Sequence, residues 1–347
     1  MNVLVTGGGG FLGRAVCRRL VARGDTVHTL HRRRHPGLDA LGVIQHLADL
    51  RDAAAVRAAV GRCEAVVHCA AKAGAYGPDR EYREINVDGT RNVLDACARA
   101  GARLVHTSSP SVVHDGRDLE GVDESAPYAR RFTAAYPRSK AAAERLVLSA
   151  AGTVPVVALR PHLIWGPGDP HFLPGLVANR RRLWLLGLAD RTVDTVYIDN
   201  AADAHVLALD RLRPGSPLCG RAYFITQGEP GGFGAWVNAL LAAAGVAPVR
   251  RRLPAPPALL AAALLEGGWR LAGRLGLDCG EPPLTRFLVE QASTAHWFDI
   301  SAARRDLGYE PRVGTAEGLA RLTAHLASHP ASHPATHPAA HPPEAAR

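Results

Sequence analysis

The chain has 347 residues, of which 47% are hydrophobic and 21% charged, so it can bury a large core and is neither a small disulfide scaffold nor a low-complexity disordered chain. Its net charge of +9 comes mainly from small arginine clusters without interleaved aromatic residues, which argues against nucleic-acid binding. Six cysteines without a Cys-x-x-Cys pair argue against a zinc site and a secreted disulfide framework, so we expect no metal site and a cytoplasmic protein.

Short apolar runs alternate with helical patterns in the first half of the chain. Val and Leu dominate the runs, as in parallel strands that are buried on both faces. The expected strands are 2–6, 26–31, 43–47, 65–69, 103–107 and 154–159, and the expected helices are 11–22, 52–60, 79–99 and 137–150. Right-handed crossovers between such units predict an α/β fold with a Rossmann-type doubly wound parallel sheet, in which ligands bind beyond the carboxyl ends of the strands.

The second half loses this alternation. A helix at 200–211 and a strand at 221–226 are expected to return to the sheet. The predicted division is therefore a nucleotide-binding domain at 1–169, joined by 194–227, and a smaller, mostly helical substrate cap at 170–193 and 228–326. From 327 to 347 the sequence repeats His-Pro every four residues, which predicts an extended, solvated tail.

One strongly apolar segment lies within the predicted cap. The stretch 253–265 is too short to cross a bilayer, which leaves a buried helix, a lid or an interfacial segment as its alternatives. The wider segment 257–277 suits a long-chain substrate, and it fits a buried cap helix equally well. Peripheral contact with a membrane is compatible with this composition.

The strongest local motif is a glycine-rich turn between the first strand and the first helix. Gly7, Gly10 and Gly13 have the spacing that lets the backbone approach a pyrophosphate, and Phe11 and Leu12 open the helix. Free N–H groups at a helix N-terminus attract such an anion. The position of the motif predicts a dinucleotide cofactor.

The ends of the second and third strands bear on the choice of cofactor. A carboxylate after the second strand would bind a ribose hydroxyl, but this chain has Arg32 in a run of three arginines, which suits a 2′-phosphate. We therefore expect NADPH, with NAD as the alternative. Asp49, which precedes Leu50 after the third strand, either receives the adenine amino group or caps the following helix.

A second motif pairs Tyr136 with Lys140, four residues apart on one helical face. A nearby ammonium group stabilises tyrosinate and lowers the pKa of the phenol, as a proton donor to a carbonyl oxygen requires. Lysine can also bind a ribose. The run of serines after the fifth strand, Ser108, Ser109 and Ser111, faces the same crevice, and spacing does not decide which serine would hold the substrate oxygen.

Together these residues resemble the extended short-chain dehydrogenase/reductases, and within them the 3β-hydroxysteroid dehydrogenase-like branch. Further shared motifs are Ala70-Ala71, Asn86 with 89–93, 159–169, 197–200 and 305–311. The resemblance implies that Ser109, Tyr136 and Lys140 are catalytic. It also implies that the cofactor-binding residues include Ala70, Ala71, Asn86, Pro161 and Leu163, and that the protein is a homodimer. The role of His162, either facing the cofactor or packed in the core, is left open.

The segments 282–287 and 291–297 resemble the bacterial 2-alkyl-3-oxoalkanoate reductases of long-chain olefin biosynthesis. This resemblance implies NADPH-dependent reduction of a long-chain, lipid-like 3-keto acid to the 3-hydroxy acid. The alternatives are a 3β-hydroxysteroid dehydrogenase, an NAD-dependent sugar-nucleotide epimerase or dehydratase, and an NADP-binding sensor without catalysis.

Overall fold

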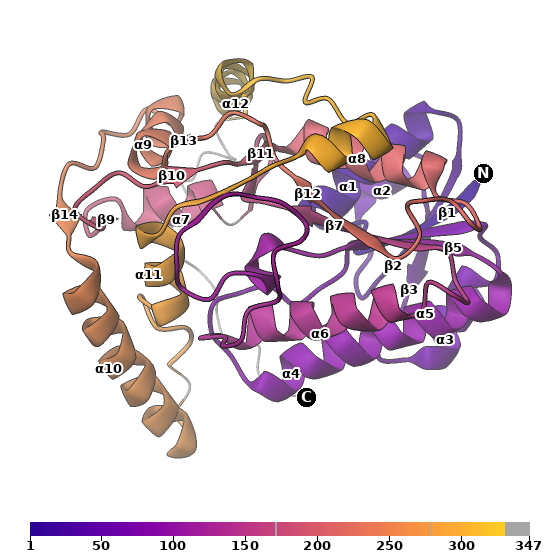
Figure 1. Cartoon of the computed structure of the whole chain (residues 1–347), viewed down its shortest axis with the longest axis horizontal. Coiled ribbons are helices and arrows are strands. Elements are labelled where there is room, and N and C mark those ends of the chain that lie inside the picture. Colours follow the sequence, from indigo (N-terminus) through magenta and orange to yellow (C-terminus); the bar gives the residue numbers. More distant parts are fainter. Residues whose placement is uncertain (171, 278, 330–347) are drawn as a thin grey trace.

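The computed structural model describes residues 1–170, 172–277 and 279–329, and its central layer is a sheet of seven parallel strands (Figure 1). These strands are β1 (Asn2–Thr6), β2 (Thr26–His31), β3 (Ile44–Leu47), β4 (Ala65–His68), β5 (Arg103–Thr107), β7 (Val156–Pro161) and β12 (Arg221–Ile225). Their order is β12-β7-β5-β4-β1-β2-β3. The direction of winding reverses between β1 and β4, and in such sheets the ligand crevice opens at that point. The predicted fold class is confirmed.

Helices cover both faces of this sheet. The helices of the sheet layers are α1 (Phe11–Ala22), α2 (Pro36–Asp39), α3 (Ala53–Val60), α4 (Asp79–Tyr82), α5 (Gly89–Ala100), α6 (Ala135–Ser149) and α8 (Ile198–Arg211). One hydrophobic core joins α1 and α8 to the sheet, and a separate core joins α3, α5 and α6 to its other face. Figure 1 shows these two groups on opposite sides of the strands.

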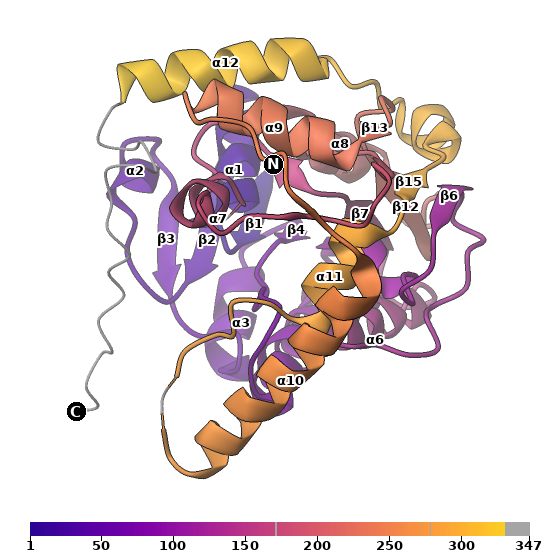
Figure 2. The same ribbon diagram turned by 90° about the vertical axis from the view of Figure 1, so that its left-hand side faces the viewer.

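The remaining elements gather mainly beyond one end of the sheet (Figure 2). Their helices are α7 (Phe172–Asn179), α9 (Phe233–Ala243), α10 (Ala255–Arg274), α11 (Arg286–Ser293) and α12 (Thr315–Ser328). Short strands form three small sheets from β6 (Leu119–Val122), β10 (Thr192–Val193), β13 (Gly231–Gly232) and β15 (His296–Phe298), from β8 (Ile164–Trp165) and β11 (Val196–Tyr197), and from β9 (Leu185–Leu186) and β14 (Arg252–Leu253).

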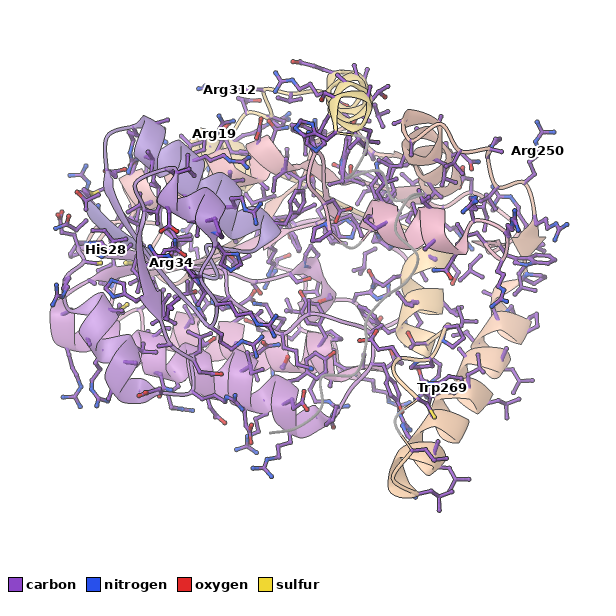
Figure 3. All side chains as sticks on the ribbon, turned by 180° about the vertical axis from the view of Figure 1, so that it is seen from behind. Arg19, His28, Arg34, Arg250, Trp269 and Arg312 are labelled. Carbon is purple, nitrogen blue, oxygen red and sulfur yellow. The ribbon has the colours of Figure 1, made fainter. Side chains whose placement is uncertain are left out.

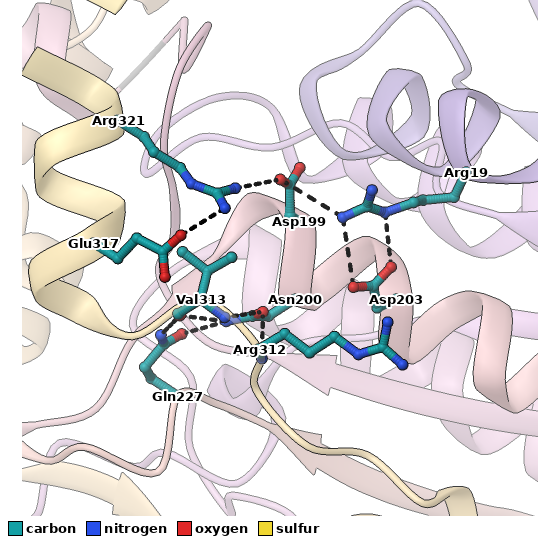
Figure 4. Close-up of polar contacts among 9 residues, drawn as sticks. All are labelled: Arg19, Asp199, Asn200, Asp203, Gln227, Arg312, Val313, Glu317 and Arg321. Atoms are coloured by element: carbon teal, nitrogen blue, oxygen red, sulfur yellow. Dashed lines mark hydrogen bonds and ion pairs between the residues drawn. The ribbon is translucent and has the colours of Figure 1, made fainter. Parts of the chain in front are cut away.

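Polar contacts of α8 tie distant parts of the chain together (Figure 4). Arg19 of α1 forms an ion pair with Asp203 at 2.7 Å, and Arg321 of α12 pairs with Asp199 at 3.4 Å. The buried amide of Asn200 accepts hydrogen bonds from the backbone N–H groups of Arg312 and Val313. Helix α12 is thereby anchored over the nucleotide-binding layers.

Several expected boundaries differ from the structure, most of them by one or two residues. Strand β7 begins at Val156 rather than Val154, because Pro155 has no N–H to donate to a ladder. The single helix expected at 79–99 is divided by a π-helical turn, η1 (Arg83–Asp88). Helix α12 includes Ala327 and Ser328, which were expected in the tail, and the tail residues 330–347 lie outside the described part of the chain.

The apolar segment of the predicted cap forms α10, but it is not a buried helix. Only Ala258, Ala262 and Glu266 are buried along it, whereas Leu264 is 69% exposed. The alternative of a buried cap helix is therefore wrong. Within the described residues, none of the helices combines the length and apolar character needed to cross a bilayer.

Candidate active site

The glycine-rich turn lies directly beyond the carboxyl end of β1. Gly7 has φ +68° and its N–H donates to the carbonyl of Leu30 at 3.0 Å, while the N–H of Gly10 donates to the carbonyl of Gly7 at 2.9 Å. A Cβ at Gly13 would lie 2.2 Å from the Gly7 oxygen, so helix and turn meet at a distance that only glycine permits. The turn delivers the uncapped N-terminus of α1 to the crevice, which is a suitable seat for a pyrophosphate.

A cleft of about 600 Å³ extends from this turn along the ends of β2, β3 and β4. It brings together seven of the fifteen residues expected to bind the cofactor: Gly7, Gly10, Arg32, Asp49, Leu50, Ala70 and Ala71. The side chains of Phe11 and Leu12 instead pack into the core. These two residues can therefore offer the phosphates only their backbone.

The three consecutive arginines after β2 have different surroundings. Arg32 and Arg33 line the cleft. Arg34 points to Asp39 and forms two hydrogen bonds with it, at 2.9 and 3.0 Å. The charge of Arg34 is therefore balanced by Asp39, whereas Arg32 and Arg33 lie where the cleft passes the end of β2.

Asp49 also lines the cleft, and it does not cap α3. Its carboxylate accepts two hydrogen bonds from the Arg51 side chain, at 2.8 and 3.0 Å, which holds the pKa of Asp49 below its ordinary value. The N-cap of α3 is Asp52, which accepts from the N–H groups of Ala54 and Ala55. The structure thus rules out the capping alternative for Asp49.

The phenol of Tyr136 is held beside the loop that follows β5. The nearby hydroxyl of Ser109 opposes the effect of burial on the pKa of this phenol, and Ser109 Oγ accepts a hydrogen bond from Ser111 Oγ at 2.9 Å. Ser108 is buried, with 3% exposure. Among the serines of this loop, the structure therefore places Ser109 beside the tyrosine.

Lys140 lies one helical turn from Tyr136, but its ammonium group is bonded to the backbone rather than to the phenol. Its Nζ donates to the backbone carbonyl of Thr107 at 2.5 Å, and burial lowers its pKa to about 8. The expected lowering of the Tyr136 pKa by this lysine is wrong. Burial raises the pKa of Tyr136, and the opposing influence is the nearby hydroxyl of Ser109.

Asn86 connects these pieces from the π-helical turn. Its Nδ2 donates to Ser139 Oγ at 2.8 Å and to the carbonyl of Lys72 at 2.9 Å, and its Oδ1 accepts from the Lys72 N–H at 2.6 Å. Ser139 in turn donates to the carbonyl of Tyr136. With 2% exposure, Asn86 positions the end of β4 against the catalytic helix, and its side-chain groups are engaged with the protein.

The end of β7 and the residues that follow it contain three further residues of interest. Pro161 pairs with Ile225 of β12, and Leu163 adopts φ +44°, a value that is uncommon for a residue with a side chain. Neither of them lines the cleft described above. The imidazole of His162 is 5% exposed, bonds the carbonyl of Asp194 and packs edge-on against His296. Its role is thus that of a packed histidine.

Comparison with known proteins agrees with this geometry. The 3-beta hydroxysteroid dehydrogenase/isomerase family matches residues 4–255. The chain belongs to this family. It is an NAD(P)-dependent oxidoreductase that acts on CH–OH or C=O groups, with the architecture of the extended short-chain dehydrogenase/reductases.

Two relatives carry the name 2-alkyl-3-oxoalkanoate reductase. The one from Stenotrophomonas maltophilia is 48% identical over 93% of this chain and 98% of its own length. The one from Shewanella oneidensis is 45% identical over 92% of this chain and 85% of its own length. Among solved structures, UDP-glucose 4-epimerase from Thermus thermophilus in complex with NAD has a TM-score of 0.69 and 26% identity, covering 94% of this chain and 99% of that one.

Lys72 also lines the cleft, although the sequence did not identify it as a site residue. It directly follows Ala70-Ala71 at the end of β4, and its Nζ lies 2.7 Å from Glu81, which also lines the cleft. Two signals in the sequence could have identified it. It follows the Ala70-Ala71 motif, and it is one of only two lysines in the chain.

Gly13→Ala should weaken cofactor binding at least about tenfold. The added methyl group would lie 2.2 Å from the Gly7 carbonyl, so the turn must move away from its position against the helix N-terminus. Fluorescence titration with NADPH measures the effect. Gly152→Ala is the control, because a Cβ there meets nothing within 4 Å. An unchanged affinity of Gly13→Ala would contradict the role of this turn.

Proposed function

We propose that the protein reduces a ketone to a secondary alcohol with NADPH. The observation that carries this proposal is the proximity of the Tyr136 phenol to the Ser109 hydroxyl, with Lys140 one helical turn away and bonded to the Thr107 carbonyl at the end of β5. A phenol and a hydroxyl that lie close together can receive a carbonyl oxygen between them.

The residues of the chain divide the work as follows. The bound cofactor would supply the hydride to the carbonyl carbon. Ser109 donates a hydrogen bond to the substrate oxygen, and Tyr136 transfers its phenolic proton to that oxygen as negative charge develops. Because burial raises the pKa of Tyr136, the phenol is protonated at neutral pH and is ready to donate. Lys140 would bind the cofactor ribose through its ammonium group.

For the substrate we propose a long-chain 2-alkyl-3-oxoalkanoate, which would be reduced to the 2-alkyl-3-hydroxyalkanoate. Support comes from the names of the two relatives at 48% and 45% identity, each of which aligns over more than nine-tenths of this chain. The segments 170–193 and 228–326 would form the substrate cap over the nucleotide-binding domain. We further propose that the protein acts in the cytoplasm as a homodimer.

A panel of substrates tests this assignment. NADPH oxidation would be followed with a long-chain 2-alkyl-3-oxoalkanoate, a 3-ketosteroid and a nucleotide sugar. We expect turnover with the first. Turnover of the steroid alone would overturn the substrate but keep the reductase. Tightly bound NAD in the purified protein, without net oxidation of NADPH on any ketone, would show an epimerase instead.

The cofactor preference should depend on the two arginines of the cleft. We expect Arg32→Gln combined with Arg33→Gln to lower kcat/KM for NADPH about 100-fold relative to that for NADH, since a charge-assisted contact to phosphate contributes about 1.5–3 kcal/mol. Arg34→Gln is the matched control, because Arg34 pairs with Asp39 and lies outside the cleft lining. Equal effects of the control and the double variant would refute a phosphate site here.

A further inference from the structure

Helix α10 presents a row of leucines to the solvent. Leu260, Leu264, Leu271 and Leu275 are 64%, 69%, 58% and 70% exposed. At 3.6 residues per turn these positions fall within an arc of about 60° on one side of the helix. Figures 1 and 2 show α10 projecting from the body of the molecule. We call this row, with the basic residues beside it, the α10 face.

The opposite side of the helix already has its partner. Ala258 and Ala262 are fully buried with Val289 of α11 in a small core. Glu266, which is 4% exposed, accepts hydrogen bonds from the backbone N–H and the side chain of Arg286, at 2.8 and 2.9 Å. The fully buried apolar residues of α10 are thus small, whereas the leucines of the row face outward, unlike those of an ordinary surface helix.

The charge around the leucine row is positive. Arg270 and Arg274 lie along one edge of the row, and Arg270 also lies 3.6 Å from the buried carboxylate of Glu266, the acidic residue of α10. At the N-terminal end of the helix, the pairing of β14 with β9 brings Arg251 to 5.7 Å from the ring of Trp184, which is 45% exposed. Figure 3 shows Arg250 and Trp269 at the end of the molecule opposite to His28 and Arg34.

We propose that the α10 face docks on the surface of a lipid bilayer with anionic headgroups. Leucines enter the acyl boundary, arginines remain at the phosphates, and an exposed tryptophan lies at headgroup depth. The helix lies on the membrane and does not cross it. Parallel packing against the same helix of a second copy is disfavoured, because it would bring Arg270 and Arg274 close to the same residues of the other copy.

Docking would place the membrane one helix away from the loop that follows β5. The other side of α11 contacts this loop through Gln291, whose Nε2 lies 2.9 Å from His114 Nδ1, and it contacts the segment before α6 through Glu290, which accepts from Thr133 at 2.6 Å. If the substrate is the lipid-like ketone proposed above, it would enter from the bilayer beside α11. Only this entry route rests on the proposed function, since docking itself follows from the α10 face.

Co-sedimentation of the full-length protein with vesicles tests the proposal. We expect binding to phosphatidylcholine vesicles that contain phosphatidylglycerol and much weaker binding to phosphatidylcholine alone. Leu264→Ser combined with Leu271→Ser should lower the partition coefficient at least about tenfold. The matched control is Leu47→Ser, because Leu47 of β3 is 56% exposed on another part of the surface. Each variant's thermal unfolding midpoint should stay at the wild-type value.

Charge variants separate the electrostatic part of binding. Arg250→Gln combined with Arg274→Gln should remove the preference for phosphatidylglycerol. The control combines Arg62→Gln, just after α3, with Arg99→Gln in α5, and this variant should retain the preference. Absence of wild-type binding to both vesicles would overturn the proposal. So would self-association in sedimentation velocity that the leucine double variant abolishes, because the face would then be a protein interface. Vesicle binding without ketone turnover would refute only the proposed function.

Discussion

Tyr136→Phe should lower kcat for ketone reduction about 10³-fold, within the range of about 10²–10⁴ that a positioned general acid contributes. The substitution removes only the phenolic hydroxyl, whose pKa the nearby Ser109 hydroxyl influences. The ring keeps its packing beside the start of α6, so the protein should fold and bind cofactor as before. Single-turnover oxidation of bound NADPH by the ketone measures the chemical step.

A control tyrosine separates loss of the proton donor from a general effect of losing a phenol. The hydroxyl of Tyr223 donates to Asp306 at 3.0 Å at the edge of the central sheet, away from the crevice. Tyr223→Phe should therefore leave kcat within about twofold of wild type. If Tyr136→Phe reduced the ketone at the wild-type rate, the proton would have to come from another group, and the proposed mechanism would be wrong.

The parts of this site that follow local rules were predictable from the sequence. Tyr136 and Lys140 share a face because helix geometry fixes residues four apart, and the glycine turn follows from its place between a strand and a helix. The doubly wound sheet follows from the alternation of apolar runs and helices. Only local spacing and composition were needed for these features.

Other features depend on contacts between distant residues, which spacing cannot supply. Arg34 differs from Arg32 because its side chain is paired with Asp39, and the sequence alone does not show this pairing. The π-helical turn around Asn86 is set by bonds to Lys72 and Ser139, which belong to other elements. The pKa of Tyr136 is raised because burial outweighs the influence of the nearby Ser109 hydroxyl, and burial depends on the assembled fold.

Which side of α10 is buried also depends on contacts between residues that are distant in the sequence. Its sequence contains both a leucine row and an alanine row, and either of them satisfies helical periodicity. The partner decides which row is buried, and α11 accepts the small side chains of Ala258 and Ala262. Sequence patterning thus identified the helix as apolar but could not tell which side faces the protein.

Arg160→Met should destabilise the protein by about 3–5 kcal/mol at neutral pH, as breaking a buried ion pair does. Arg160 and Glu144 are 4% and 0% exposed, and their side chains form two hydrogen bonds at 2.6 and 3.0 Å. Without the guanidinium group, the carboxylate of Glu144 would keep only the 2.8 Å bond from the Tyr128 hydroxyl. Chemical denaturation measures the free energy of unfolding, and Arg80→Met, in an exposed pair with Glu84, should cause no measurable loss.

The pH dependence of this loss follows from the pKa of Glu144. Burial alone would raise that pKa, but Arg160 holds it below the ordinary value in the wild type. The pair's contribution is therefore present above the pKa of the unfolded carboxyl, about 4.3, and it is lost as pH falls through the folded pKa. In Arg160→Met, burial raises the pKa, so the variant gains a proton and the loss should shrink as pH falls toward 4.3. A loss that stayed constant between neutral pH and that value would mean that packing of Arg160 against Phe224, rather than its charge, stabilises this region.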